Sequence, residues 1–552
     1  MEVVKSRKKN SLRNLVFGLS YQVLNLICSF VCRTVLIYFL GEQILGINSL
    51  YTNILSLLAL AELGIGNIML VKLYKPIAEG DKETITAYIN YYKKIYHVIA
   101  LIVFTLGLCF LPFLNFIVSD EVLISNQDLI IYFLIFLFNT VSSYFVVYKH
   151  TLINANQQSS ILKTFNIFTL LAKTALRMVI LFTIKDYRLY LLVDLVCNII
   201  ANVSISVYVS KKYPYLKNKN SLDNEKRKEI KIGIKDIFLY KIGGTLITNT
   251  DSIIISAMLG TTLVGYLSNY NLIITALTGF LSSLTSAIFA SVGNMAVTSS
   301  KENVYKVFKS FVMAYHVIGA FCGITLMCVF NDFIFMWLGT KFMLGWEVVA
   351  ALSFNFYFMT AITPVYIFRE NFNLFSKAKY LFLIAAVINI VSSIILAYFL
   401  GLVGVILGTI ICRMFTTFIF EPPYLCKTVF NRSSKSYFFS QIKMFVVTII
   451  SFIASYFICK FIPINIGLFF VKILVCFVIT AVLFSLFFFK TDEYKYLFNT
   501  AKEIVANLKN KLKGKENKKQ QTEASFQEDA QQVNEIEVEN DKEETKDIKV
   551  NE

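Results

Sequence analysis

Apolar runs of 18 or more residues recur along this chain from about residue 15 to residue 489. A run of this length crosses a hydrocarbon core of about 30 Å as a helix, because a helix satisfies every backbone polar group within the segment itself. Only 16% of the residues are charged and 56% are hydrophobic, whereas about a quarter of the residues of a soluble protein are charged. The sequence therefore predicts an all-α polytopic membrane protein.

Fourteen runs are long enough to be transmembrane helices. Two of them, residues 44–71 and 263–290, are longer than one crossing requires, so we expect tilting or an extension beyond the membrane. The predicted spans are residues 15–39, 44–71, 95–118, 129–148, 161–184, 189–209, 237–259, 263–290, 307–330, 348–368, 380–400, 403–425, 444–461 and 466–489.

The loops between these spans alternate sharply in Lys and Arg content. Residues 1–13 hold five, residues 72–94 hold five and residues 210–236 hold nine. Short basic loops stay on the cytoplasmic side, so we expect a multi-pass protein of the cell membrane with both termini in the cytoplasm. The first run follows basic residues but is too long for a signal peptide, and we expect it to be the first helix. The opposite loops hold four basic residues: Lys185, Arg188, Lys341 and Lys460.

One short motif occurs twice, as Leu40-Gly41-x4-Gly46-x4-Tyr51 and as Leu259-Gly260-x4-Gly265-x4-Tyr270. The offset of 219 residues spans six predicted helices, so the two copies have the same orientation in the membrane. This predicts two pseudo-symmetric six-helix lobes joined by a basic cytoplasmic linker, with two further helices after them. The predicted domains are residues 1–209, 210–236, 237–425 and 444–489.

The segment after the last span changes character twice. Residues 490–515 have apolar side chains at helical spacing with lysines between them, which is typical of a helix lying on the anionic inner leaflet. Residues 516–552 are acidic and almost free of aromatic residues. We expect this tail to be disordered.

Charged residues within the predicted spans are the candidates for function, because a charge at the bilayer centre costs about 2.5–3.5 kcal/mol and must face a cavity or a partner. Four of them, Lys241, Lys472, Asp194 and Glu421, lie near a helix end and can reach the interface. Six lie deeper, and each of these either has a function, such as binding a ligand, or forms a buried structural ion pair. The deep set is Arg33, Glu62, Lys173, Arg177, Asp251 and Arg413.

The deep set holds four cations and two carboxylates, which favours an anionic substrate such as a phosphate or pyrophosphate group. Lys173 and Arg177 share one helix face, where they repel each other unless an anion lies between them. The 219-residue offset of the repeat maps Arg33 onto Ser252, next to Asp251, so the two charges are expected at matching depth in opposite lobes. We hypothesise that Arg33 and Asp251 meet across a central cavity and close its external gate. Glu62 and Asp251 are the candidate gating or coupling residues.

Three segments are informative together: the end of the first helix from Arg33 to Gly41, Ala61-Glu62-Leu63-Gly64-Ile65-Gly66, and the run from Asn249 to Gly260. With the fourteen predicted helices, they resemble the Wzx-type polysaccharide flippases, in the superfamily of the lipid II flippases and the MATE exporters. The resemblance covers residues 12–490.

The resemblance implies movement of an undecaprenyl-pyrophosphate-linked oligosaccharide from the inner to the outer leaflet by alternating access, with other polysaccharide-assembly proteins as partners. In lipid II flippases first-helix arginines line a cationic cavity, and Arg33 matches that pattern. The two extra helices would form a groove for the lipid tail, which suits the Phe-rich residues 484–489. The other binding candidates, Lys173, Arg177 and Arg413, depend on their depth alone.

Other classes are less compatible with the sequence. The three histidines are scattered and no P-loop, HExxH or GxSxG motif occurs, so we expect no enzyme, no cofactor and no nucleic-acid partner. The energy would then come from substrate flux or from an ion such as H+ or Na+. Ten cysteines form no CxxC pair and are expected to be buried structural thiols. A MATE-like exporter of drugs or small molecules is the alternative function, and a scaffold or receptor is a third.

Overall fold

The computed structural model describes residues 2–59, 65–118, 124–372, 374–503 and 506. These residues form helices joined by short turns, and they contain no strand. The chain divides into two compact units, residues 1–483 and residues 484–552. The predicted all-helical class is confirmed.

The first eight helices are α1 (Glu2–Leu58), α2 (Ile65–Glu79), α3 (Lys82–Phe110), α4 (Leu114–Ile117), α5 (Asn126–Tyr144), α6 (Val147–Ala155), α7 (Ser159–Thr183) and α8 (Tyr187–Lys212). The next nine are α9 (Asn224–Leu259), α10 (Thr261–Thr298), α11 (Lys301–Leu338), α12 (Trp346–Asn371), α13 (Phe375–Leu400), α14 (Leu402–Arg413), α15 (Glu421–Leu425), α16 (Lys435–Lys460) and α17 (Ile466–Phe488). Short 3-10 or π-helical turns join some of them: η2 (Leu111–Phe113), η3 (Pro214–Lys217), η4 (Thr340–Phe342), η5 (Met414–Phe418) and η6 (Cys426–Phe430).

Twelve stretches among the described residues are long and apolar enough to cross a membrane. The difference from the predicted fourteen has two sources. Residues 16–58 form one such stretch, although α1 is broken at Gly41 (φ 82°, ψ −179°), which separates the first two predicted spans. The eighth predicted span corresponds to α10, which is not one of the twelve stretches. The 38 residues of α10 nevertheless include no Asp, Glu, Lys or Arg.

Several helices begin where the sequence supplies a cap for the free backbone N–H groups of the first turn. Asp81 accepts a hydrogen bond from the Thr84 backbone nitrogen at the start of α3. Ser125 caps α5 and Asp186 caps α8 in the same way. The caps of α5 and α8 fix the ends of helices that carry residues of the candidate site.

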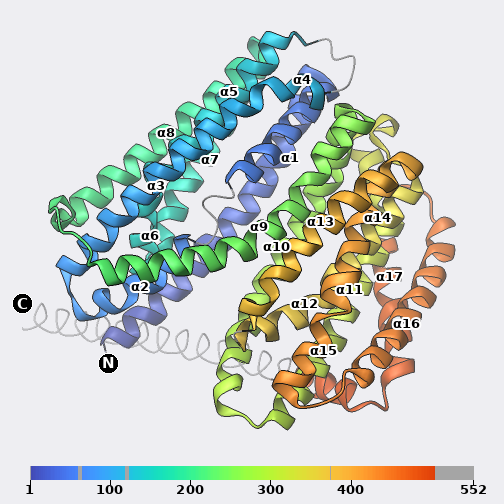
Figure 1. Ribbon diagram of the computed structural model, residues 1–552. Coiled ribbons are helices and arrows are strands. Elements are labelled where there is room, and N and C mark those ends of the chain that lie inside the picture. Colours follow the sequence, from blue (N-terminus) through green and yellow to red (C-terminus); the bar gives the residue numbers. More distant parts are fainter. Residues whose placement is uncertain (1, 60–64, 119–123, 373, 504–505, 507–552) are drawn as a thin grey trace, which may run out of the picture. The chain divides into compact units, whose positions relative to one another are not determined.

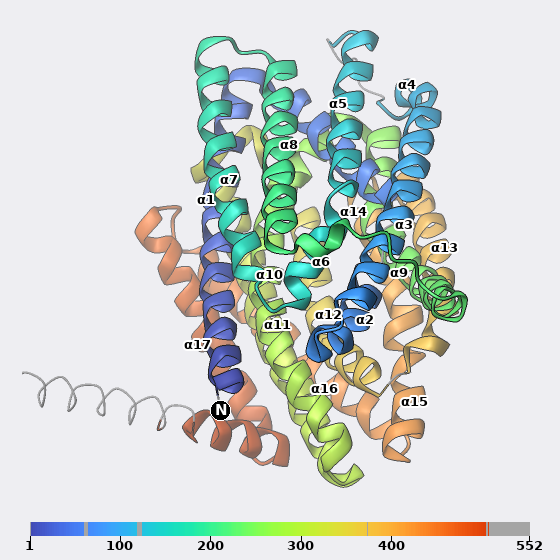
Figure 2. The same ribbon diagram turned by 90° about the vertical axis from the view of Figure 1, so that its left-hand side faces the viewer.

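The helices of the two predicted lobes pack mainly among themselves. In the first lobe α5 packs against α3 and α8, and α7 packs against α8; in the second, α12 packs against α11 and α14 (Figure 1). The main exception is α1, which contacts α7 of its own lobe and both α9 and α10 of the other lobe; α2 and α4 also contact α9. Figure 2 shows α7 alongside α1. The long first helix therefore joins the two halves of the first unit.

The repeated motif has the same geometry in both copies. Gly41 (φ 82°) and Gly260 (φ 109°) both have the left-handed backbone that favours glycine. Tyr51 and Tyr270 are both fully buried. The Tyr51 hydroxyl donates to the Leu129 carbonyl at 3.1 Å. These shared features support the internal repeat.

The second glycines of the two motifs lie against each other where α1 crosses α10. A Cβ atom on Gly265 would be 2.9 Å from the Gly46 nitrogen and 3.1 Å from the Glu42 carbonyl oxygen. A Cβ atom on Gly46 would be 2.3 Å from the Thr261 carbonyl oxygen. Thr261 follows Glu42 by the same 219 residues as Gly265 follows Gly46. The contact is therefore symmetric, and it brings two backbones together as closely as glycine allows.

Large apolar side chains are exposed along the outward faces of many helices, as expected where lipid replaces water. On α13, for example, Val387, Val391 and Ile395 follow one face and are each at least half exposed. The interior contains one extensive apolar core that draws on helices of both lobes. The exposed apolar faces agree with the assignment to a membrane.

In the second unit, residues 492–503 are helical, in agreement with the start of the predicted interfacial helix. The Tyr494 and Phe498 rings stack on this segment with centroids 6.1 Å apart. Residues 504–505 and 507–552, which include the predicted acidic tail, lie outside the described residues. Contact of this segment with the inner leaflet stays a prediction.

Replacing Gly46 or Gly265 by alanine should weaken the junction between the two lobes, because each new methyl group would meet rigid backbone. We expect a loss of about 1–3 kcal/mol in stability, measured as a lower Tm of the purified protein. Gly18→Ala is the matched control, since a Cβ atom there has nothing within 4 Å. Equal Tm values for all three variants would contradict the close contact.

Candidate functional site

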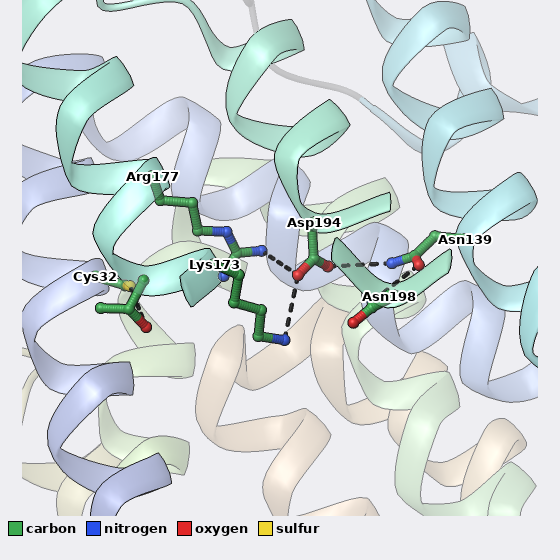
Figure 3. Close-up of polar contacts among 7 residues, drawn as sticks. Cys32, Asn139, Lys173, Arg177, Asp194 and Asn198 are labelled. Carbon is green, nitrogen blue, oxygen red and sulfur yellow. Dashed lines mark hydrogen bonds and ion pairs between the residues drawn. The ribbon is translucent and has the colours of Figure 1, made fainter. Parts of the chain in front are cut away.

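Lys173 and Arg177 of α7 both point toward one carboxylate, that of Asp194 on α8 (Figure 3). The Asp194 Oδ1 atom lies 3.2 Å from Lys173 Nζ and 2.9 Å from Arg177 Nη2. The repulsion between the two cations is therefore relieved by an anion of the protein itself. Asp194 had been expected to reach the membrane surface, but its carboxylate instead forms these ion pairs and is only about one fifth exposed (19%).

Polar and aromatic neighbours hold Asp194 and Arg177 in place. Asn139 Nδ2 of α5 donates to Asp194 Oδ2 at 3.1 Å, and Asn198 Nδ2 donates to Asn139 Oδ1 at 2.9 Å (Figure 3). The Arg177 guanidinium lies 4.5 Å from the Tyr190 ring centroid, within the range of a cation–π contact. Two cations and one carboxylate leave this cluster with a net positive charge.

Helical spacing in the sequence indicates that some of these neighbours lie on the same side of α8. Tyr190, Asp194 and Asn198 follow one another at intervals of four residues, so they share one face of α8. Asn139 could not be found in this way, because it lies on another helix and depends on the packing of α5 against α8.

Arg33 connects the two lobes through neutral partners. Its Nη1 atom donates to Ser268 Oγ at 2.9 Å and to Asn269 Oδ1 at 3.1 Å, both on α10. It also interacts electrostatically with Tyr190. Within the described part of the chain, Arg33 has no carboxylate within ion-pairing distance.

The hypothesis that Arg33 and Asp251 pair at a gate is not supported by the structure. Arg33 is bound by α10, and the partner of Asp251 is Thr409 of α14, whose Oγ1 atom donates to Asp251 Oδ2 at 2.8 Å. Asn389 Nδ2 of α13 donates in turn to Thr409 Oγ1 at 3.0 Å. The other carboxylate oxygen, Asp251 Oδ1, is buried without a hydrogen-bond partner.

A cavity of about 470 Å³ lies beside Asp251, lined by α9, α10, α11, α12 and α14 with one residue from α1. Arg413 also lines it and donates from Nη1 to Asn355 Oδ1 at 2.9 Å. The rest of the polar lining consists of hydroxyl and amide groups: Asn53, Thr248, Ser252, Asn271, Thr278, Ser282, Thr285, Tyr315, Asn355, Thr360, Thr363, Tyr366 and Thr409.

A second cavity of about 290 Å³ shares Arg413 with the first. Its wall also includes Arg369, which is buried and pairs with Glu370 at 3.0 Å and with Glu421 at 2.5 Å. Glu421 had been expected to reach the interface, and it is instead buried in this ion pair. Arg369 was missed because it was counted with a cytoplasmic loop, whereas α12 continues to Asn371.

The deep charges therefore fall into two places within the described structure. Lys173 and Arg177 lie in the first lobe around Asp194, with Arg33 where that lobe meets α10, while Asp251 and Arg413 line the cavity of the second lobe. Glu62 lies outside the described residues.

These groups offer two kinds of chemistry. Guanidinium groups with neutral partners can bind phosphate oxygens. The free oxygen of Asp251, with Thr409 and Asn389 nearby, presents hard oxygen ligands of the kind that bind a proton or an alkali cation.

Residues 11–290 match a family described as polysaccharide biosynthesis protein. This is half of the chain, and the chain belongs to that family. No curated protein matches the chain at a significant level.

The chain has the fold of several solved transporters at low sequence identity. A lipid II flippase MurJ in an inward closed conformation is 15% identical over 86% of this chain and 98% of its own, with a TM-score of 0.63. An inward-facing multidrug resistance MATE family transporter of the MOP superfamily is 14% identical over 73% and 96%, with a TM-score of 0.56. The MATE multidrug transporter DinF-BH is 16% identical over 78% and 97%, with a TM-score of 0.53.

Asp194→Asn should destabilise the first lobe, because it leaves Lys173 and Arg177 close together without their anion. We expect a loss of about 3 kcal/mol, at the low end of the range for breaking a buried pair because the groups are partly exposed. Thermal unfolding measures it. Asp128→Asn is the control, since its partner Arg188 is half exposed (50%), and it should change the Tm little. A stable Asp194→Asn protein would show that the cations do not need this partner.

Proposed function

We propose that this membrane protein moves a lipid-linked anionic oligosaccharide, carried on undecaprenyl pyrophosphate, from the inner to the outer leaflet. The observation that carries the proposal is the polar cavity of about 470 Å³ with Arg413 in its wall. Membership of a polysaccharide biosynthesis family and the fold of a lipid II flippase support it.

The cavity lining suits a saccharide attached to a phosphate. Hydroxyl and amide side chains can both donate and accept hydrogen bonds, as sugar hydroxyls require. Arg413 supplies a cation whose described hydrogen-bond partner is the neutral Asn355. Arg33 has the same property at the junction with α10, because Ser268 and Asn269 are neutral.

Lys173 and Arg177 are weaker candidates for direct binding, because Asp194 already neutralises part of their charge. In our proposal they give the first lobe a positive potential that attracts the pyrophosphate group. Alternating access would then expose the central polar surfaces to each side in turn through rocking of the two lobes.

We propose further that both termini lie in the cytoplasm of a cell-membrane protein, with residues 490–515 on the anionic inner leaflet; the basic loops support this orientation. Other proteins of polysaccharide assembly would be partners there. Asp251 is proposed as the site at which H+ or Na+ couples to transport, because its Oδ1 atom is buried and lacks a partner. Glu62 remains a candidate for the same role.

A MATE-like ion-coupled exporter of drugs or other small molecules is the second candidate. The specific observation in its favour is the same buried carboxylate, since Asp251 lines the cavity and would suit a cationic compound. Arg413 in the same wall disfavours that ligand through like-charge repulsion.

Depletion of the protein should make lipid-linked saccharide accumulate in the cytoplasmic leaflet, measured by accessibility of the saccharide to an external probe. Arg413→Gln should reproduce the accumulation, and Arg413→Lys should restore part of the transport because the charge remains. Arg432→Gln is the matched control, since Arg432 is about half exposed (47%) and lies in an ion pair with Glu302. Unchanged saccharide together with altered drug tolerance would favour the exporter instead.

Asp251→Asn should abolish the response of transport to an imposed Na+ or proton gradient, because the amide can neither release a proton nor supply a charged ligand. In vesicles, whichever of the two gradients stimulates transport by the wild-type protein should stimulate the variant about tenfold less or weaker still, and tenfold is equivalent to about 1.4 kcal/mol. Asp128→Asn should leave it intact. A variant at Asp251 that still responds fully to the gradient would remove this residue from the coupling step.

A further inference from the structure

Three cysteines from three different helices converge in the first unit. Cys328 lies on α11, Cys459 on α16 and Cys476 on α17. Their Sγ atoms all lie within 4.8 Å of one another, and Cys459 Sγ is 3.9 Å from Cys476 Sγ. The three are far apart in the sequence, so no spacing motif indicates the cluster.

The spacing of the sulfur atoms suits a shared metal ion. Three thiolates that each lie about 2.3 Å from a central ion are about 4 Å from one another in a trigonal arrangement. A disulfide has an S–S length of about 2.05 Å and uses only two of the three sulfurs. Cys459 and Cys476 are buried, while Cys328 is partly exposed, which leaves a side from which an ion can enter.

A buried cation lies next to the thiols. Lys472 is one turn before Cys476 on α17, and its Nζ atom pairs at 2.6 Å with the carboxylate of Asp332, one turn after Cys328 on α11. Lys472 also interacts electrostatically with Cys459. An ammonium group beside thiols favours their deprotonated form, which is the form that binds metal. The positive charge of Lys472 also favours a metal ion of low charge, and Asp332 offsets only part of that effect.

We propose that Cys328, Cys459 and Cys476 form a binding site for one thiophilic d10 cation, with Cu(I) as the best match. Soft thiolate ligands select Cu(I) over harder ions. Zn(II) in a structural site takes four ligands, and among the described residues the cluster offers three. Binding releases the proton of each thiol that becomes a ligand, and no oxidation or reduction occurs.

This site is separate from the transport cavity and does not depend on the proposed function. The ion would connect α16 and α17 to α11, because one ligand comes from each helix. We therefore expect Cu(I) to raise the Tm of the purified protein as well as to bind to it.

The test is titration of the full-length protein in detergent with Cu(I) under anaerobic, reducing conditions against a chromogenic Cu(I) chelator. We expect one equivalent of tightly held Cu(I) and three sulfur neighbours of copper by X-ray absorption. Cys328→Ser, Cys459→Ser and Cys476→Ser should each lower the affinity by about 100-fold or more, since each removes a ligand. Cys426→Ser, a buried cysteine elsewhere, should retain both the binding and the rise in Tm.

Several results would overturn the assignment. They are absence of binding by the wild-type protein, retention of full affinity by any of the three variants, preference for Zn(II) over Cu(I), or a disulfide between two of these cysteines in protein isolated without reductant. Thermal unfolding of each metal-free variant shows whether that variant is folded. If a variant is misfolded, the number of sulfur neighbours of copper in the wild-type protein, measured by X-ray absorption, tests the assignment instead.

Discussion

The cost of a charge in hydrocarbon determines much of the arrangement of this protein. Within the described residues, Lys173 and Arg177 share Asp194, Arg369 is paired with Glu421, and Lys472 with Asp332. Each of these pairs joins different helices, so the same contacts that neutralise a charge also fix helices relative to one another. Two deep arginines, Arg33 and Arg413, have neutral hydrogen-bond partners among the described residues, and Arg413 also interacts electrostatically with Asp251.

Each lobe contains one of these two arginines, and their surroundings differ, because Arg33 bonds to α10 whereas Arg413 faces a cavity. In the first lobe Lys173 and Arg177 share the single carboxylate of Asp194, which leaves a net positive charge. In the second lobe Arg413 and Asp251 face a cavity whose remaining polar lining is neutral. The two copies of a repeated fold thus hold different charged groups in different surroundings, in agreement with the principle that function depends on sites more than on folds.

Much of the fold could be predicted from the sequence, since spans of apolar residues and the repeat around Gly41 and Gly260 depend on local patterns. The pairing of deep charges could not, because it depends on which helix faces align. Asp194 is an example, as its distance from the helix end suggested the interface whereas the packing of α7 against α8 brings it to Lys173. Arg33 and Asp251 do not pair in this structure for a related reason, because the repeat predicts equivalent positions but not the neighbours that each side chain finds.

The contact of Gly46 with Gly265 has a consequence for how this sequence can change. A residue that meets its own counterpart in the other repeat lies on the axis that relates the two copies. At most packed contacts a larger side chain on one helix can be accommodated by a smaller one on its partner. Here both partners are already glycine, the smallest residue, and the nearest other atoms are backbone atoms of residues 42 and 261. The two lobes can therefore diverge almost everywhere else, whereas at this point no second substitution is available to compensate for the first.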